Sequence, residues 1–241
     1  MSGRFTYAAI MLAAVAVAAW LSRDSQARLG LSFHQRVMVG LGAFSGGFLA
    51  AKLPFVLVYV VDGDWAALLS GRALLADGKT IMLGLVGGYV GVELAKWWSG
   101  VRVSTGDSFA VSVPVAVAIG RLACFTNGCC HGIATSAPWG IDFGDGVSRH
   151  PTQLYETAFH LACGVALAVM RRDGLLRGQL IKLYLLLYFV FRFATEFLRP
   201  EVRLWGGWTG YQWAALLLVP IFTALWWHDA RTGRGRFDAV G

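Results

Sequence analysis

Charged residues are scarce in this sequence. Asp, Glu, Lys and Arg make up only 15% of its 241 residues, whereas 56% are hydrophobic and ten are tryptophan. In soluble domains about a quarter of the residues are charged, so the composition excludes an ordinary soluble globular protein. No long polar stretch is present that could form a separate soluble domain. We therefore predict a single integral membrane domain over residues 1–241.

A patch of interleaved basic and aromatic residues is also lacking, although the net charge is +7. Such a patch would be expected of a nucleic-acid-binding surface. Basic residues also collect in the cytoplasmic loops of membrane proteins and beside anionic lipid headgroups. We therefore expect membrane lipid, and no nucleic acid, among the partners.

The hydrophobic residues are arranged in runs. Runs of about 18 or more residues with few charges can cross a hydrocarbon core roughly 30 Å thick. Seven candidate spans follow, at residues 7–21, 37–61, 80–98, 108–124, 153–170, 178–198 and 210–228. A signal peptide is the alternative for the first span, but no small-residue cleavage site follows it. The predicted fold is all-α, a polytopic membrane protein with about seven transmembrane helices.

The distribution of Lys and Arg predicts the orientation of these spans. Most of the basic residues outside the spans lie on one side, near residues 23–36, 96–102 and 171–177 and in the C-terminal tail. Because basic residues favour the cytoplasmic side, we predict that the N-terminus is outside and the C-terminus is cytoplasmic. The loop at residues 125–151 then faces the periplasm or the cell exterior.

Four polar residues share one face of the sixth predicted span. Tyr188, Arg192, Glu196 and Arg199 follow one another at i, i+4, i+8 and i+11, which places them in one helical stripe. A charge inside a span costs about 2.5 to 3.5 kcal/mol on insertion scales, so such residues usually pair or function. A structural ion pair, with Glu196 between the two arginines, is the simpler interpretation. The surplus positive charge favours an anion-binding site.

Another charged residue lies at the end of the fourth predicted span, in the pair Gly120-Arg121. The arginine side chain presents a forked set of donors that fits phosphate or carboxylate. Its alternative interpretation is snorkelling of the side chain toward the interface. Taken together with the polar stripe of the sixth span, Arg121 strengthens the prediction of an anion-binding site in the outer half of the membrane.

The loop before the fifth predicted span ends in Arg149 and His150, followed by a proline that suits the first turn of a helix. A helix N-terminus flanked by basic side chains can receive a phosphate. The helix then carries Gln153, Glu156 and His160 on one face. His150 is interpreted either as a catalytic residue or as a simple helix-entry residue, and His160 as a hydrogen-bonded packing residue.

Three of the four cysteines cluster near this loop, at Cys124, Cys129 and Cys130. Together with His131 they form a C-x4-C-C-H spacing, which is not a common zinc pattern, so we expect no metal. An exported loop permits a disulfide between Cys124 and Cys129 or Cys130. Plain buried cysteines at helix ends are the remaining alternative, and the sequence does not decide between them.

The segment from Arg149 to Glu156, Arg-His-Pro-Thr-Gln-Leu-Tyr-Glu, resembles the Arg-His-Pro-Ser-Gln-Leu-Tyr-Glu motif of bacterial prolipoprotein diacylglyceryl transferases. The stripe in the sixth span and the glycine-rich third span also resemble this family. Its Gly-Arg-x-x-Asn-Phe-x-Asn-Gly-Glu-x-x-Gly signature is matched at Gly120, Arg121, Phe125, Asn127, Gly128 and Gly132. The resemblance extends in order over most of residues 40–228.

This resemblance implies an enzyme of the bacterial inner membrane whose active site opens toward the periplasmic or outer leaflet. It implies transfer of a diacylglyceryl group from phosphatidylglycerol to a cysteine thiol of a lipoprotein precursor, with release of glycerol phosphate and with no metal or organic cofactor. Arg121 and Arg192 would hold the phosphate, with Tyr188 nearby, and His150 completes the predicted catalytic residues. The predicted substrate-binding residues are Gly87, Gly88, Gly120, Asn127, Gly132, Arg149, Gln153, Tyr155, Glu156, Glu196 and Arg199.

Three residues depart from the family pattern. The family's His-Gly-Gly begins here with Val86, and its signature asparagine and glutamate are Cys124 and Cys129. A valine cannot move a proton, so a general base would have to come from elsewhere, such as His131 or His150. Two alternative functions therefore remain. One is transfer to another acceptor, with Cys129 or Cys130 as a nucleophile, and the other is phospholipid binding or scrambling without catalysis.

Overall fold

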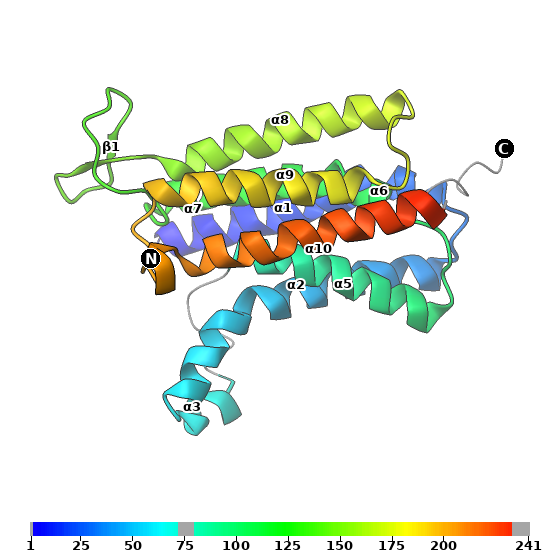
Figure 1. Ribbon diagram of the computed structural model, residues 1–241, viewed down its shortest axis with the longest axis horizontal. Helices are drawn as coiled ribbons and strands as arrows, with labels where there is room; N and C mark the ends of the chain where they lie inside the picture. Colours follow the sequence, from blue (N-terminus) through cyan, green and yellow to red (C-terminus); the bar gives the residue numbers. More distant parts are fainter. Residues whose placement is uncertain (1, 72–79, 233–241) are drawn as a thin grey trace. The chain divides into compact units, whose positions relative to one another are not determined.

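The computed structural model describes residues 2–71 and 80–232, and most of these residues are helical (Figure 1). Two short strands, β1 and β2, form the one hairpin in the described residues. The elements in chain order are α1 (Ser2–Ala27), α2 (Phe33–Val61), α3 (Trp65–Leu69), α5 (Ile81–Ser99), α6 (Gly106–Phe109), α7 (Ser112–Thr126), β1 (Ile141–Asp142), β2 (Ser148–Arg149), α8 (Thr152–Arg172), α9 (Leu180–Thr195), η1 (Glu196–Leu198), η2 (Trp205–Gly207) and α10 (Gly210–Thr232).

Each of the seven predicted spans coincides with one of the longer helices, α1, α2, α5, α7, α8, α9 or α10. Within residues 2–71 and 80–232, five helical segments are long and apolar enough to cross a membrane, namely Phe5–Ala27, Phe33–Val61, Gly106–Thr126, Thr152–Arg172 and Gly210–Thr232. Many large apolar side chains along these helices are exposed, as expected for surfaces that face lipid. The prediction of an all-α, multi-pass membrane protein is confirmed. The number of seven spans and their orientation stay predictions.

The chain divides into two compact units, one from Gly30 to Arg102 and the other formed by residues 1–29 together with residues 103–241. In the first unit α2 and α5 pack against each other. Glycine makes this packing possible, because a Cβ atom on Gly42 would meet the carbonyl oxygen of Gly91 and lie only 2.7 Å from the Cβ of Ala95. Small residues of this kind let membrane helices approach closely.

Gly42→Ala is expected to lower the apparent Tm of the protein in detergent, because the added methyl group must push α2 and α5 apart. Gly40→Ala is a matched control on the same helix, since a Cβ atom there meets nothing within 4 Å. In a helix the change from glycine to alanine normally stabilises by about 0.5 to 1 kcal/mol, so the control should raise Tm or leave it unchanged. Equal shifts for the two variants, measured by thermal unfolding, would contradict the close packing.

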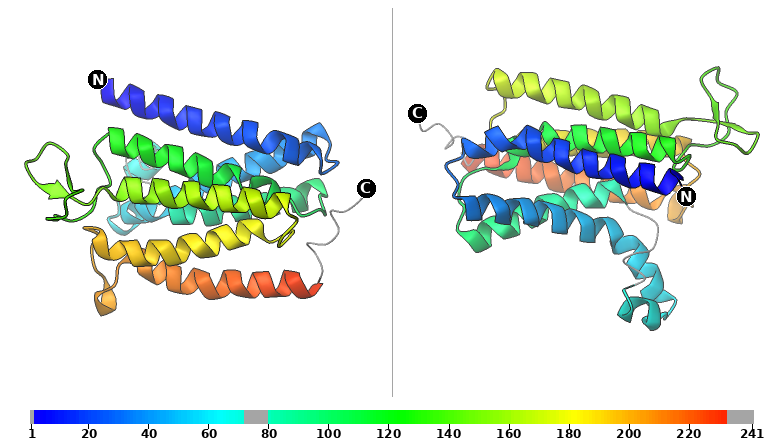
Figure 2. Two further views of the ribbon diagram at one scale, coloured as in Figure 1. Left: turned by 90° about the horizontal axis from the view of Figure 1, so that it is seen from above. Right: turned by 180° about the vertical axis from the view of Figure 1, so that it is seen from behind.

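In the second unit α7 lies between α1 and α8, and α9 packs against α10, as Figure 2 shows. Contacts between α8 and α9 join these two groups of helices. The buried face of α8 carries Gln153, Glu156, Thr157, His160 and Leu167, which share the spacing of one helix face. This face is polar near the N-terminus of α8, and the last helical turns of α7 and α9 supply further polar residues there.

Candidate active site

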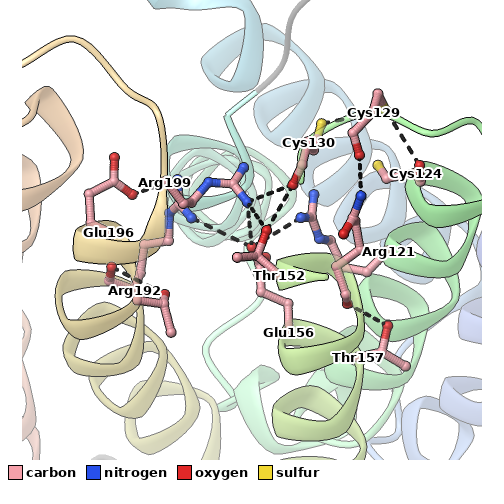
Figure 3. A network of polar contacts seen from close by, with 12 residues as sticks. Arg121, Cys124, Cys129, Cys130, Thr152, Glu156, Thr157, Arg192, Glu196 and Arg199 are labelled. Atoms are coloured by element: carbon pink, nitrogen blue, oxygen red, sulfur yellow. Dashed lines mark hydrogen bonds and ion pairs between the residues drawn. The ribbon is translucent and has the colours of Figure 1, made fainter. Parts of the chain in front are cut away.

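The buried carboxylate of Glu156 on α8 is the centre of the polar cluster in Figure 3. Its Oε1 atom lies 3.1 Å from Nη2 of Arg121 and 3.5 Å from Nη1 of both Arg192 and Arg199. The three arginines are themselves buried. All three contacts are to the same oxygen, so the three guanidinium groups share the two acceptor positions of Oε1.

The three arginines come from three different segments of the chain. Arg121 belongs to α7 and Arg192 to α9, whereas Arg199 follows the short helix η1 in an extended conformation (φ −113°, ψ 146°). Pro200 comes next, and a residue before proline avoids the helical conformation. The prediction that one continuous helix carries the stripe as far as Arg199 is therefore wrong, since α9 ends at Thr195.

Arg192 has two further contacts. Its Nη2 atom lies 2.8 Å from Oε2 of Glu196, one helical turn away, and its guanidinium group lies over the ring of Tyr211 at 4.3 Å from the ring centroid. A second carboxylate near Arg199 is that of Glu201, at 3.7 Å from Nε. These contacts hold the two guanidinium groups in place beside Glu156.

The buried charges of the cluster do not cancel. Three buried arginines face two buried carboxylates, Glu156 and Glu196, while Glu201 is 40% exposed. Nε of Arg121 and Nη1 of Arg192 are buried without a hydrogen-bond partner in the described residues. Buried donors are almost always satisfied, and an unmatched donor often indicates a bound ion or water. The cluster is therefore suited to an anion, which was the prediction from the sequence.

The loop after α7 is held against this cluster by hydrogen bonds to its backbone. Gln153 Nε2 donates to the carbonyl of Cys129 at 2.6 Å, and Thr152 Oγ1 and Arg199 Nη1 both donate to the carbonyl of Cys130 at 2.9 Å. Gly132 completes the contact, because a Cβ atom there would lie 2.9 Å from the side chain of Thr152. The signature glycine thus lets the loop approach the N-terminus of α8.

Three cysteine thiols gather in this loop and at the end of α7. The Sγ atoms of Cys124, Cys129 and Cys130 all lie within 4.8 Å of one another, and those of Cys129 and Cys130 are 3.5 Å apart. All three cysteines are free. Hydrogen bonds with the other two thiols lower the pKa of Cys130, and the charges of Arg121 and Arg199 lower it further. The sequence spacing could not show this convergence.

The two basic residues before α8 lie in other surroundings. Arg149 belongs to strand β2 and pairs with Asp145 in the hairpin loop, with Nη2 2.5 Å from Oδ2. His150 Nδ1 lies 3.1 Å from the hydroxyl of Tyr155, which accepts a hydrogen bond from Trp139 Nε1 at 2.8 Å. Arg149 therefore does not join the ion pairs around Glu156, and its role in substrate binding stays a prediction.

Further predicted residues occupy the interior of the second unit. Tyr188 is buried on α9, with its ring 5.0 Å from that of His160. His160 is also hydrogen-bonded, since its Nδ1 lies 3.0 Å from the hydroxyl of Tyr184. The prediction that His160 is a hydrogen-bonded packing residue is confirmed. Its Nε2 has no partner in the described part of the chain.

The remaining predicted residues are glycines and a helix-end asparagine. Gly120 faces Met11 of α1 at ordinary contact distance, and Asn127 caps the C-terminus of α7. Gly87 and Gly88 belong to the other compact unit, where they approach the backbone of α2. For these two glycines and Gly120 the structure shows helix packing. Their role in substrate binding stays a prediction.

Two residues that contribute to the cluster were missed by the sequence analysis. Thr152 hydrogen-bonds to Arg199 Nη1 through Oγ1 at 2.9 Å, and Tyr211 stacks under Arg192. Thr152 stands inside the motif that ends at Glu156, and its place in that motif was a usable signal. For Tyr211, which lies in the first turn of α10, no spacing in the sequence indicated a contact with α9.

Comparisons with known proteins all match this chain to the same protein family. The sequence profile described as prolipoprotein diacylglyceryl transferase matches residues 5–228. A phosphatidylglycerol–prolipoprotein diacylglyceryl transferase of Nitratidesulfovibrio vulgaris is 32% identical over 222 residues, which cover 86% of this chain and 82% of the relative. Proteins of the same name from Clostridioides difficile and Pseudomonas paraeruginosa are 28% and 31% identical, over 83% and 74% of this chain and 80% and 70% of their own lengths.

Proposed function

Because this chain belongs to the prolipoprotein diacylglyceryl transferase family, we propose that it transfers a diacylglyceryl group from phosphatidylglycerol to the thiol of a lipoprotein-precursor cysteine. Its relatives are transferases, and their printed names specify phosphatidylglycerol and prolipoprotein. We place the reaction in the bacterial inner membrane, on the periplasmic or outer-leaflet side. The N-terminus would be outside and the C-terminus cytoplasmic.

The observation that carries this proposal is the meeting of three arginines around Glu156 with donors to spare. Among the described residues, Nε of Arg121, Nη1 of Arg192 and Nε of Arg199 are buried donors without a hydrogen-bond partner, and a phosphate diester offers acceptor oxygens to such donors. Arginine forks in a site shielded from water bind phosphate strongly. Glu156 would hold the guanidinium groups in position before the lipid binds, with Glu196 and Tyr211 supporting Arg192.

In the proposed reaction the acceptor sulfur attacks the glycerol carbon of the diacylglyceryl group that carries the phosphate. A carbon–sulfur bond forms, the carbon–oxygen bond to phosphate breaks, and glycerol phosphate leaves with the bonding electrons. Arg121 and Arg192 are already in place to stabilise the charge of the leaving phosphate, which is where fixed positive groups contribute most to rate. Tyr188 lies one helical turn from Arg192 on α9, and we place it beside the leaving phosphate.

The thiol proton must go to a base, because the thiolate is the nucleophile. We assign this role to His150, whose ring contacts Tyr155 at the entrance to α8. His131 is the alternative, and its ring stacks on Phe143 with the centroids 5.0 Å apart. Both histidines lie in the loop before α8 and are half-buried.

One reconstitution assay tests the proposal. The purified protein would be incubated in vesicles with phosphatidylglycerol labelled in its headgroup and acyl chains, together with a peptide that carries a lipoprotein-precursor cysteine. We expect a lipidated peptide and released glycerol phosphate in equal amounts. A peptide with serine in place of the cysteine is the control, and it should give neither product.

The same assay separates the second candidate function, transfer to another acceptor. That candidate is favoured by Cys129 and Cys130 beside the arginines, where a protein thiol could itself attack the lipid. Release of glycerol phosphate with an unmodified peptide would support it, and mass spectrometry would then locate any lipid on the chain. Release of neither product would contradict both transferase functions and leave phospholipid binding.

A further inference from the structure

Three thiols close together form a set of ligands for a metal ion. The Sγ atoms of Cys124, Cys129 and Cys130 lie within 4.8 Å of one another, and one pair is 3.5 Å apart. A four-coordinate zinc ion has zinc–sulfur distances of about 2.3 Å, which places its sulfur ligands about 3.8 Å from one another. The 3.5 Å pair is close to this value and the other separations are at most 4.8 Å, so small side-chain rotations would bring all three sulfurs onto one ion.

The backbone around these thiols is held rigidly. The carbonyls of Cys129 and Cys130 accept three side-chain hydrogen bonds, from Gln153, Thr152 and Arg199, with lengths of 2.6 to 2.9 Å. Cys130 also has a positive φ of 63°, a left-handed conformation that non-glycine residues keep only where the surroundings enforce it. A loop fixed in this way presents its ligands without first having to be ordered.

The charges around the cluster suit a metal–thiolate complex. Three thiolates on a divalent cation leave a net charge of −1. Arg199 lies beside this loop, with Nη1 2.9 Å from the carbonyl oxygen of Cys130, and its positive charge offsets the charge of the complex. Sulfur ligands select soft or borderline ions such as zinc and monovalent copper, whereas magnesium and calcium require oxygen. The cluster therefore specifies the class of ion as well as its position.

We propose that Cys124, Cys129 and Cys130 form a binding site for one thiophilic metal ion, with zinc as its test ion. Three protein ligands leave the fourth position of a tetrahedral ion open, as in catalytic rather than structural zinc sites. The site departs from the prediction of no metal, which rested on sequence spacing alone. It does not depend on the proposed transferase function, because it follows from the cysteines and the loop that holds them.

Metal binding is tested directly on the full-length protein, purified under reducing conditions in detergent without lipid or acceptor. Zinc would be added, excess removed by gel filtration, and metal per chain measured by mass spectrometry. We expect one zinc per chain in the wild type. Cys124→Ser, Cys129→Ser and Cys130→Ser should each weaken binding more than about 100-fold, since loss of an outer-shell partner alone typically costs 10- to 100-fold.

Cys163→Ser is the matched control, because Cys163 is a buried cysteine in α8 outside the cluster, and it should bind zinc as the wild type does. Cobalt in place of zinc should give a sulfur-to-cobalt charge-transfer absorption that the three cluster variants lose. If a cluster variant fails to elute as a folded protein, the wild type still provides a test. Zinc should then slow alkylation of the exposed Cys130.

Three results would contradict the proposal of a metal-binding site. The first is reduced wild-type protein that retains no zinc, and the second is equal zinc binding by the cluster variants and the wild type. The third is a disulfide between two of the three cysteines in protein isolated with its thiols blocked at lysis, combined with no zinc binding after reduction. A failed transferase assay would leave the metal result unchanged, because no substrate is present in this experiment.

Discussion

Glu156→Ala is expected to destabilise the protein by about 3 to 5 kcal/mol and to abolish turnover. Removing one partner of a buried ion pair leaves the other charge uncompensated, and costs of this size follow. Here one carboxylate faces three buried guanidinium groups, with Arg121 nearest at 3.1 Å. The measurement is thermal unfolding of the purified protein in detergent, followed by tryptophan fluorescence, together with the transferase assay.

Glu201→Ala and Glu156→Gln are the control variants for the stability measurement. Glu201→Ala also removes a carboxylate near Arg199, at 3.7 Å, but that carboxylate is 40% exposed, and surface changes usually stay within about 0.5 kcal/mol. Glu156→Gln keeps the shape and the hydrogen-bonding oxygen but loses the charge, so we expect a loss of stability between those of the two alanine variants. If Glu156→Ala unfolds at the same temperature as Glu201→Ala, Glu156 does not hold the cluster together.

Arg192→Ala is the second variant with a large expected effect, a fall in turnover of about 100- to 1,000-fold. Loss of one preorganised donor to a developing charge typically costs this much. Arg192 is fixed by Glu196 at 2.8 Å and by the ring of Tyr211, so it need not reorganise when the phosphate leaves. Arg192→Lys should also fail, because an ammonium group keeps the charge but lacks the planar fork.

The matched control for Arg192→Ala is Arg203→Ala. Arg203 is an exposed arginine whose hydrogen bond goes to the carbonyl of Gly207, and its loss should leave kcat unchanged. Arg121→Ala should behave like Arg192→Ala, since both arginines have buried donors that lack a hydrogen-bond partner in the described part of the chain. Near-normal kcat in both Arg121→Ala and Arg192→Ala would contradict the assignment of the phosphate site.

Arg149 and Arg199 illustrate which part of the site could be predicted from the sequence and which part could not. Arg149 stands beside the start of α8 in the chain and was expected to bind substrate there. In the structure its ion pair is with Asp145 in the hairpin loop, while Arg199 contacts Glu156. Arg199 reaches that position because α9 ends at Thr195 and a short 3-10 turn follows. Helical spacing alone could not predict where the helix would tighten.

The cysteines show a second limit. Spacing suggested neither a metal site nor a definite disulfide, yet the three thiols converge. Their convergence depends on the turn after α7 and on hydrogen bonds from Gln153, Thr152 and Arg199 to the loop backbone. These donors stand more than twenty residues away in the chain, and their contacts arise only when α7, α8 and α9 are packed together.

The helical membrane fold, the position of Gln153 and Glu156 on one face of α8, and the family could all be predicted from the sequence. Hydrophobic runs and residue spacing act locally, so they are readable along the chain. Which charges meet was decided by the tertiary structure. Arg121, Arg192 and Arg199 lie on three segments, and a buried carboxylate brings them together only after the helices have packed. The physical reason is that ion pairs depend on distance in space, which local sequence does not contain.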